Sequence, residues 1–222
     1  MAKDSFQREK KQSLSKLDKS RKGSIDAKMA KLVAAINRNP DYYTTSSCSG
    51  RTILMIVPRE RKKWESEWLF TSHGRTTFTK LKKSLLKLPE EPAWFKKEGM
   101  ILHVCCRTIE AASDLADSAV KAGFRRSGII AKKRIIAEIN DTEKIEVPVS
   151  MEGRLLVDDS YIRLLVELAN EKQDRTMKKI RKLYKLITSI KKSKIKRNYQ
   201  NKLLISLTRT QLQGLSQSQA EH

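Results

Sequence analysis

The sequence predicts an α+β protein in which helices pack on a mixed, largely antiparallel sheet. Strand-like apolar segments come in pairs between helices, whereas a doubly wound parallel sheet would alternate one strand with one helix. Neither Gly-x-Gly-x-x-Gly nor a P-loop pattern occurs, which argues against a Rossmann-type cofactor site. A long C-terminal helix, basic in its later part, is predicted from near Asp159 or Ser160.

The charge balance is the strongest compositional signal. The chain of 222 residues carries 47 Lys and Arg against 25 Asp and Glu, a net charge of +22. Such a surplus predicts a polyanionic partner, with nucleic acid and an acidic membrane surface as the two candidates. Hydrophobic residues make up 39% of the chain, which is enough for a buried core.

Several classes of protein are excluded early. No apolar run reaches the ~18 residues that span a bilayer, and the polar N-terminus lacks the apolar centre of a signal peptide. The three cysteines, Cys48, Cys105 and Cys106, fit neither a disulfide framework nor a C-x-x-C zinc pattern. We therefore predict a cytoplasmic protein with no membrane partner and no metal site.

The N-terminal elements follow from helical spacing and from breakers. Residues 1–22 form a basic lead-in with weak helical spacing. Ser24 is the expected cap of a helix whose apolar residues recur at helical intervals from Ile25 to Ile36, and Pro40 ends it. After the lead-in we predict a single domain over 23–190 and a basic, then polar, tail over 191–222.

The later elements are read from apolar runs and turn residues. They are, in order, a hydroxyl-rich loop at 42–51, a strand at 52–57, a basic hairpin-like stretch at 58–63, a strand at 68–73, a helix at 76–88, a connector at 93–99, a strand at 100–107, a helix at 109–122 closed by Gly123, strands at 127–131, 134–140 and 144–149, and the long final helix.

Basic residues are clustered. Residues 178–197 contain ten Lys and Arg and no acid, and residues 121–134 contain six and no acid. One such cluster alone is often a solvated face. Together, on a chain of this charge, they favour phosphate binding by counterion release. No aromatic RNA-binding motif accompanies them, so they predict a polyanion and not a sequence reader.

The densest polar constellation is the segment 44–51, which reads TTSSCSGR. Its hydroxyls, glycine and arginine can present N–H, O–H and guanidinium donors to a carboxylate or a phosphate. The alternative is a Ser/Thr turn whose hydroxyls bond their own backbone. If Cys48 were a nucleophile it would need an acid–base partner, and none is evident beside it. His73 and His103 each occur alone in a strand, and such histidines are often structural as well.

Specific strings of residues resemble a known family. They are DKSRKGSID (18–26), TTSSCSGR (44–51), WLFTSH (68–73), ILHVCCR (101–107), AGFRRSGI (122–129), EVPV (146–149) and LLVELANEK (164–172). In this order they resemble the tRNA wybutosine-synthesizing methyltransferases of archaea and eukaryotes. The resemblance covers residues 6 to about 185.

The resemblance implies that S-adenosylmethionine donates a methyl group to ring nitrogen 4 of a tricyclic guanosine that bears an aminocarboxypropyl side chain. That base lies at position 37 of tRNA-Phe, beside the anticodon. The implied fold is not that of the Rossmann methyltransferases. The basic lead-in, residues 121–134 and the C-terminal helix would then hold the anticodon stem–loop.

Physical chemistry suggests roles for the residues in the matching strings. Methyl transfer needs placement more than covalent help, and the acceptor nitrogen must lose its proton to a base. S-adenosylmethionine and the aminocarboxypropyl side chain of the substrate each carry a carboxylate that needs a cationic or N–H partner. The candidate catalytic residues are His73, His103 and Asp26. The candidate binding residues are Ser46, Ser47, Ser49, Gly50, Arg51 and Ser127, with Arg107 and Arg126 as second choices.

Two other functions stay open from the residues alone. A non-enzymatic RNA-binding protein would explain the charge but not the SSCSGR string or the two strand histidines. A membrane-surface protein would use the basic C-terminal helix, although long helices usually pack such an apolar stripe on the core.

Overall fold

The computed structural model describes the backbone of the chain except residues 1, 16–25, 58–66, 87, 132 and 219–222, and the side chains except these and residues 2–4, 131 and 190–218. The chain divides into two compact units, Met1–Tyr184 and Lys185–His222. The first unit contains all the strands described below. The predicted division at residues 22 and 190 stays a prediction.

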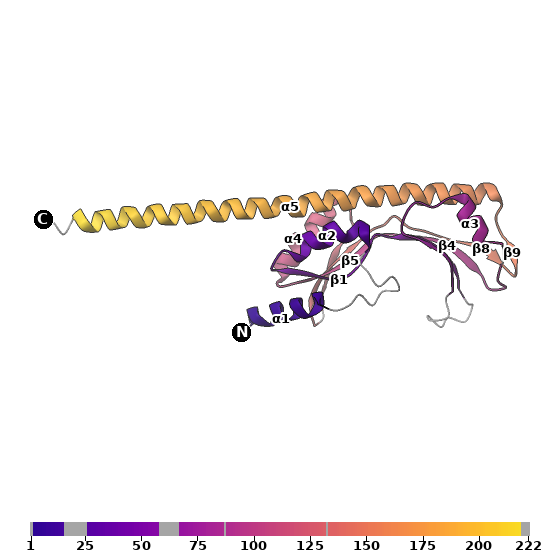
Figure 1. Cartoon of the computed structure of the whole chain (residues 1–222), viewed down its shortest axis with the longest axis horizontal. Helices are drawn as coiled ribbons and strands as arrows, with labels where there is room; N and C mark the ends of the chain where they lie inside the picture. Colours follow the sequence, from indigo (N-terminus) through magenta and orange to yellow (C-terminus); the bar gives the residue numbers. More distant parts are fainter. Residues whose placement is uncertain (1, 16–25, 58–66, 87, 132, 219–222) are drawn as a thin grey trace. The chain divides into compact units, whose positions relative to one another are not determined.

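The elements alternate between helices and runs of strands (Figure 1). In chain order they are α1 (Ala2–Leu14), α2 (Ala27–Asn37), β1 (Tyr42–Cys48), β2 (Arg51–Ile56), β3 (Trp68–Ser72), α3 (Phe78–Ser84), β4 (Ala93–Glu98), β5 (Ile101–Cys106), α4 (Ile109–Ala122), β6 (Gly128–Ala131), β7 (Ile135–Asn140), β8 (Ile145–Met151), β9 (Arg154–Leu155) and α5 (Asp159–Ser218).

The strands form two sheets. Sheet A has the order β1-β5-β7-β6, and sheet B has the order β3-β2-β4-β8-β9. Each described pairing is antiparallel, which confirms the predicted α+β class. The final helix begins at Asp159, as predicted. That its later part presents a basic surface stays a prediction, because those side chains lie outside the described residues.

Three connections carry the chain from one sheet to the other at the same place. β1 of sheet A leads through Ser49 and Gly50 into β2 of sheet B, β4 leads through Gly99 and Met100 into β5, and β7 leads through residues 141–144 into β8. We call this place the crossover. Gly50 has φ +83°, and a Cβ there would lie 2.5 Å from the Glu98 carbonyl oxygen, so only glycine fits.

One cluster of buried core residues lies between sheet B and the first half of α5. Leu54, Phe95 and Val149 of the sheet are buried against Ile162 and Leu165 of α5. These α5 residues recur at helical spacing, which explains why the helix packs along the sheet.

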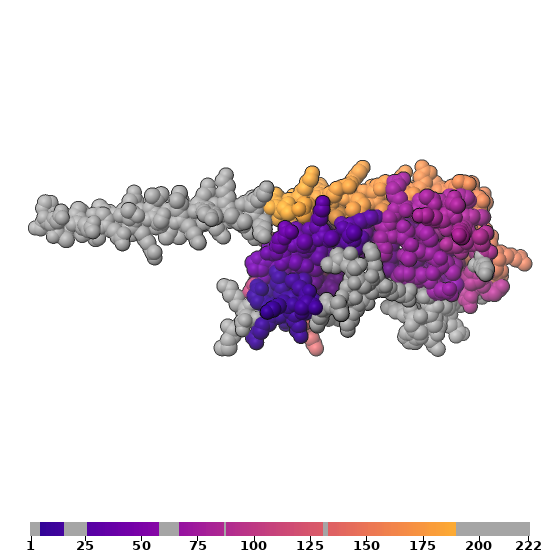
Figure 2. Space-filling view, in the orientation of Figure 1, coloured from indigo at the N-terminus to yellow at the C-terminus, as the bar shows by residue number. Residues whose placement is uncertain are grey.

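Helix α1 covers one end of sheet A (Figures 1 and 2). The rings of Phe6 and Tyr43 lie 5.4 Å apart, and the Tyr43 hydroxyl donates to Glu9 Oε2 at 3.1 Å. Figure 2 shows this helix in indigo on the visible face. The lead-in, expected to have only weak helical spacing, thus contains a docked helix.

The structure corrects three predicted elements. The hydroxyl-rich segment is the strand β1 and not a loop, because it pairs along its length with β5. The connector is the strand β4, which pairs with β2 on one side and β8 on the other. Its side chains alternate in burial, but the charged residues in the sequence KKE obscure that pattern. The cap of α2 is Asp26, whose carboxylate accepts the Lys28 N–H at 3.1 Å, while Ser24 lies outside the described residues.

Other boundaries agree or shift slightly. Helix α4 runs from Ile109 to Ala122 and ends at Gly123 with φ +110°, as predicted. Helix α3 is shorter than the predicted 76–88, because it is capped by Thr77 and ends at Ser84. The hairpin-like stretch predicted at 58–63 lies outside the described residues.

Candidate active site at the crossover

Three side chains from three adjacent strands line up on one face of sheet A. Ser46 of β1 is opposite His103 of β5, which is opposite Glu138 of β7. The Ser46 hydroxyl lies 2.9 Å from His103 Nδ1, and His103 Nε2 lies 2.7 Å from Glu138 Oε2. The His103 and Glu138 side chains are 30% and 28% exposed, so a ligand can reach the imidazole. We call these three residues the histidine row.

The sequence predicts Ser46 and His103 as site residues but misses Glu138. The signal that could have found Glu138 is its place in the β7 segment IIAEIN, where it is the only charged residue and follows three apolar ones. Without the register of β5 against β7, however, nothing indicates that it faces a histidine.

Cys48 lies two residues beyond Ser46 on the same face of β1. Burial raises the pKa of its thiol, and the nearby Arg51 charge lowers it only in part. A thiol that stays protonated is a weak nucleophile. Its environment therefore favours a packing role for Cys48 over a nucleophilic one.

Asp26 and Ser49 form a buried polar pair beneath the crossover. The Asp26 carboxylate accepts the Ser49 hydroxyl and, at 3.2 Å, the Ser49 N–H, and both residues are at most 6% exposed. Burial raises the Asp26 pKa, but the hydrogen bonds from Ser49 and Lys28 outweigh it and leave the pKa below its usual value. Asp26 thus caps α2 and anchors the start of the crossover.

His73 lies just after β3, close enough to Asp26 to contribute to lowering its pKa. Its carbonyl oxygen accepts from Lys28 Nζ and from Gln173 Nε2, and Gln173 also donates to the Ser49 carbonyl at 3.5 Å. The two predicted catalytic residues Asp26 and His73 are therefore brought together. They belong to the buried network under α5, while His103 lies on the open face of sheet A.

Arg51 begins sheet B. Its Nε donates to Glu98 Oε2 at 2.6 Å, and its guanidinium lies 4.2 Å from the centre of the Trp68 ring. The side chain is 26% exposed. The predicted clamp arginine is thus held by a carboxylate and an aromatic face and stays partly exposed.

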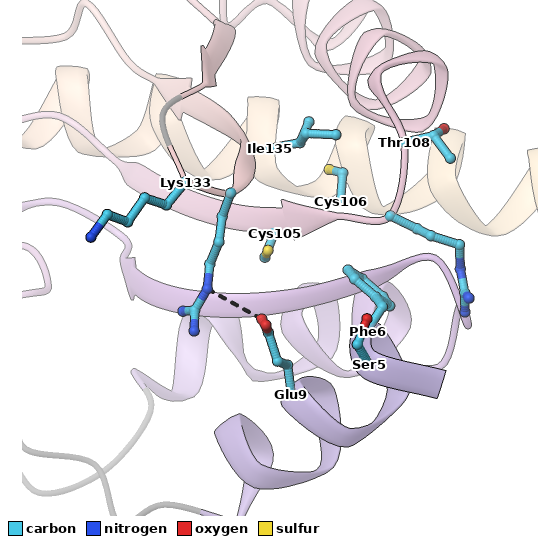
Figure 3. A pocket seen from close by; sticks show the side chains of 10 residues that line it. Ser5, Phe6, Glu9, Cys105, Cys106, Thr108, Lys133 and Ile135 are labelled. Carbon is cyan, nitrogen blue, oxygen red and sulfur yellow. Dashed lines mark ion pairs between the residues drawn. The ribbon is translucent and has the colours of Figure 1, made fainter. Parts of the chain in front are cut away.

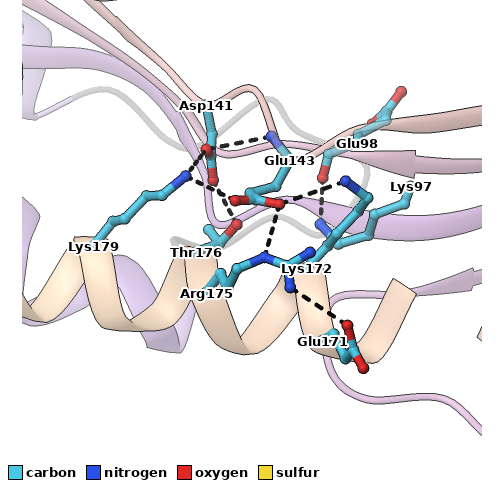
Figure 4. Close-up of polar contacts among 9 residues, drawn as sticks. All are labelled: Lys97, Glu98, Asp141, Glu143, Glu171, Lys172, Arg175, Thr176 and Lys179. Carbon is cyan, nitrogen blue, oxygen red and sulfur yellow. Dashed lines mark hydrogen bonds and ion pairs between the residues drawn. The ribbon is translucent and has the colours of Figure 1, made fainter. Parts of the chain in front are cut away.

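The third crossover connection is clamped to α5 by charge (Figure 4). Asp141, 1% exposed, accepts from Thr176 Oγ1 at 2.5 Å and from Lys179 Nζ at 2.8 Å. Glu143 accepts from the same Lys179 at 3.0 Å and from Arg175 at 3.1 Å. These contacts fix the end of β7, and with it the strand that carries Glu138.

Lys97 is a buried lysine at the crossover. It is 1% exposed, and its Nζ donates to the Glu98 carbonyl at 2.6 Å (Figure 4). Burial lowers its pKa from 10.5 to about 8, against the attraction of the Asp141 and Glu143 carboxylates. Lys97 therefore loses its proton at a lower pH in the folded state than in the unfolded chain.

This burial predicts a pH-dependent stability. Between pH 8 and 10 the unfolded chain binds a proton that the folded chain has lost, so the free energy of unfolding should rise. The Lys97→Met variant should lack about 2–3 kcal/mol of that rise. Urea unfolding at pH 7 to 10 measures how the free energy of unfolding changes with pH. The same change in the variant and the wild type would contradict a buried Lys97 ammonium that destabilises the fold.

Two cavities lie along the strand direction, on either side of Glu138 in β7. The larger, about 450 Å³, is lined by Ser5, Phe6, Glu9, Cys105, Cys106, Arg107, Thr108, Lys133, Arg134 and Ile135 (Figure 3). The smaller, about 270 Å³, is lined by Arg126, Asn140, Asp141, Thr142 and Lys144. Along β7, Glu138 is three residues from Ile135 and two from Asn140, or about 10 Å and 7 Å.

The remaining predicted residues are placed apart from the row. Arg107 ties β5 to the loop after α2 through Asp41 Oδ1 at 2.8 Å and the Pro40 carbonyl at 3.0 Å, and it lines the larger cavity. Arg126 is exposed beside the smaller cavity, and the Ser127 hydroxyl donates to the Phe124 carbonyl at 2.7 Å.

Ser47 lies on the opposite face of β1 from Ser46, because its cross-strand partner is the buried Leu102. The SSCSGR string therefore does not act as one loop. Ser46 and Cys48 reach the open face, Ser49 joins the buried network, and Gly50 and Arg51 turn the chain into sheet B.

Comparison with known proteins decides the family. The family model described as Methyltransferase TYW3 matches residues 8–189. The chain belongs to this family. The match to the TYW3 model confirms the resemblance inferred from the sequence strings. Because the members of this family are methyltransferases, the chain is a methyltransferase.

TYW3 relatives are similar over most of the chain. The tRNA wybutosine-synthesizing protein 3 homolog of Danio rerio is 39% identical over 184 residues, 81% of this chain and 73% of the relative. The tRNA(Phe) 7-((3-amino-3-carboxypropyl)-4-demethylwyosine(37)-N(4))-methyltransferase 1 of Pyrococcus furiosus is 36% identical over 183 residues, 81% of this chain and 93% of the relative.

A solved structure has the same fold. The PH1069 protein from Pyrococcus horikoshii superposes with a TM-score of 0.77 at 34% identity, covering 84% of this chain and 98% of that one. Among the described residues, none of the helices is long and apolar enough to cross a membrane.

Proposed function

We propose that this methyltransferase acts in the cytoplasm on tRNA-Phe, where it methylates ring nitrogen 4 of the 7-aminocarboxypropyl-demethylwyosine at position 37. The activity for which the Pyrococcus furiosus relative is named supports this substrate. The structural observation that carries the proposal is the open histidine row, in which His103 is hydrogen-bonded on both ring nitrogens. A histidine held in this way can accept the proton that the acceptor nitrogen must lose.

The contacts within the histidine row indicate which atoms would carry that proton. S-adenosylmethionine, when bound, supplies an electrophilic methyl group. Ser46 is exposed, and its hydroxyl lies against His103 Nδ1, so an acceptor N–H that approaches Ser46 can pass its proton toward the imidazole. The task of the remaining site residues is to hold the two reactants in line above the row.

The cavities fit two ligands that each carry a carboxylate. The larger is lined by Lys133, which suits a carboxylate, by Arg107 and Arg134, which also pair with Asp41 and Glu9, and by the Phe6 ring, which suits a flat base, in a volume typical of cofactor sites. This donor set fits S-adenosylmethionine. The smaller offers Arg126 and Lys144, which suit the aminocarboxypropyl carboxylate.

The other predicted residues then shape the site. Gly50, Ser49 and Asp26 build the bend that follows β1, the strand that carries Ser46, with His73 in the same network. Arg51, stacked on Trp68, presents a cationic and aromatic surface suited to unstacked nucleotides. In this proposal Asp26 and His73 position the site, and His103 is the base.

A single-turnover assay tests the function. Purified protein is mixed with S-adenosylmethionine and tRNA-Phe isolated from cells that lack this step, and nucleosides are read by mass spectrometry. One added methyl at position 37 is expected. Intact tRNA binding without methylation would overturn the catalytic proposal and leave a non-enzymatic RNA-binding protein.

The net charge of +22 predicts how tRNA binding responds to salt. We propose that the basic clusters hold the anticodon stem–loop by its phosphates, so several counterions are released on binding. Affinity for tRNA-Phe should fall at least about tenfold between 50 and 200 mM salt. Fluorescence anisotropy over this range measures the slope, and an affinity that does not change with salt would rule out phosphate contacts as the main attraction.

A further inference from the structure

Glu138 is placed to act on His103. Its carboxylate lies 2.7 Å from His103 Nε2, and the two residues are directly opposite in adjacent strands, so the backbone register sets their approach. On the other side of Glu138 in sheet A the partner is Gly128, which has no side chain. Within the described part of sheet A, His103 is thus the only side chain directly across from Glu138.

The hydrogen bond decides which ring nitrogen of His103 carries the proton. An ionised carboxylate can only accept, so the N–H of a neutral imidazole must lie on Nε2. Nδ1 is then the acceptor, and it receives the O–H of Ser46, which lies 2.9 Å away. The nitrogen that can take up a proton therefore points toward the exposed end of the row.

We propose that Glu138 is the positioning residue of this methyltransferase, which holds His103 in the tautomer with a basic Nδ1 facing Ser46. This inference rests on the proposed function and adds to it a residue for the proton transfer. Glu138 itself touches no reactant.

The proton path balances. As the N–C bond to the methyl forms, the C–S bond of the sulfonium donor would break and its electron pair would stay on sulfur, which leaves as a neutral thioether. The acceptor nitrogen gives its proton to Ser46 Oγ, and Ser46 gives its own proton to His103 Nδ1. The ring becomes an imidazolium, whose charge faces the Glu138 carboxylate, and the excess proton later passes to water. No oxidant, reductant or further reactant is required.

The first test separates rate from binding. Glu138→Gln keeps the size of the side chain but can donate to Nε2, which favours the wrong tautomer. We expect kcat to fall about 10- to 100-fold, with the KM values and the tRNA affinity unchanged. Glu146→Gln is the matched control, since Glu146 is also a strand glutamate but pairs with Lys96 of sheet B.

The second test reads the tautomer in the protein without substrates. Nitrogen-15 NMR of histidine-labelled protein, assigned with His103→Gln, should show His103 protonated on Nε2 in the wild type and a shifted tautomer population in Glu138→Gln. A wild-type ring protonated on Nδ1, or an unchanged tautomer together with unchanged kcat in the variant, would overturn the proposal.

This readout also distinguishes the two proposals from each other. If the tautomer responds to Glu138 but the wild-type protein never methylates tRNA-Phe, the proposed function fails while the positioning contact stands. If methylation is normal but the tautomer is the wrong one, only the inference about Glu138 fails.

Discussion

Replacing His103 by glutamine is expected to lower kcat about 100- to 10,000-fold, the usual contribution of a positioned general base. Glutamine retains a polar side chain near Ser46 and Glu138, so the sheet should stay folded, but an amide cannot take up the proton of the acceptor nitrogen. Single-turnover rates at saturating tRNA and S-adenosylmethionine measure the effect on chemistry alone.

His222→Gln is the matched control, because it makes the same chemical change beyond the residues that match the family model. It should have the wild-type rate. Binding of tRNA-Phe by the His103 variant should also be unchanged, since the proposed phosphate contacts are made by the basic clusters and not by His103. A normal rate for His103→Gln at saturating substrates would exclude His103 as the base.

Gly50→Ala should lower the free energy of unfolding by at least about 3 kcal/mol. The backbone at Gly50 has φ +83°, which costs a side chain about 1–2 kcal/mol, and the new Cβ would lie 2.5 Å from the Glu98 carbonyl oxygen. The contact is with backbone of the neighbouring crossover connection, so no side-chain rotation can relieve it.

The control for this variant is Gly128→Ala. A Cβ at Gly128 meets nothing within 4 Å, and its φ is outside the left-handed region, so stability should change by less than about 1 kcal/mol. Guanidinium unfolding of both variants gives the comparison. Equal stabilities for the two would show that the close approach of the connections at the crossover is not required.

The elements that could be predicted from sequence are those with strong local signals. Helix α4 has an apolar stripe, a Thr108 cap and a closing Gly123, and these local groups determine both of its ends. The strands β1 and β4 lack such signals. Their polar composition is typical of loops. These segments become strands only because they pair with segments distant in sequence, which supply the backbone hydrogen bonds.

The same division applies to the site. The sequence by itself determined the family, the positive charge and the individual candidates Ser46 and His103, because these depend on residue identity and local order. Tertiary structure alone decided that Glu138 faces His103, that Asp26 holds Ser49, and that Ser47 points away. These relations depend on strand register, in which a shift of one residue would turn every side chain to the other face.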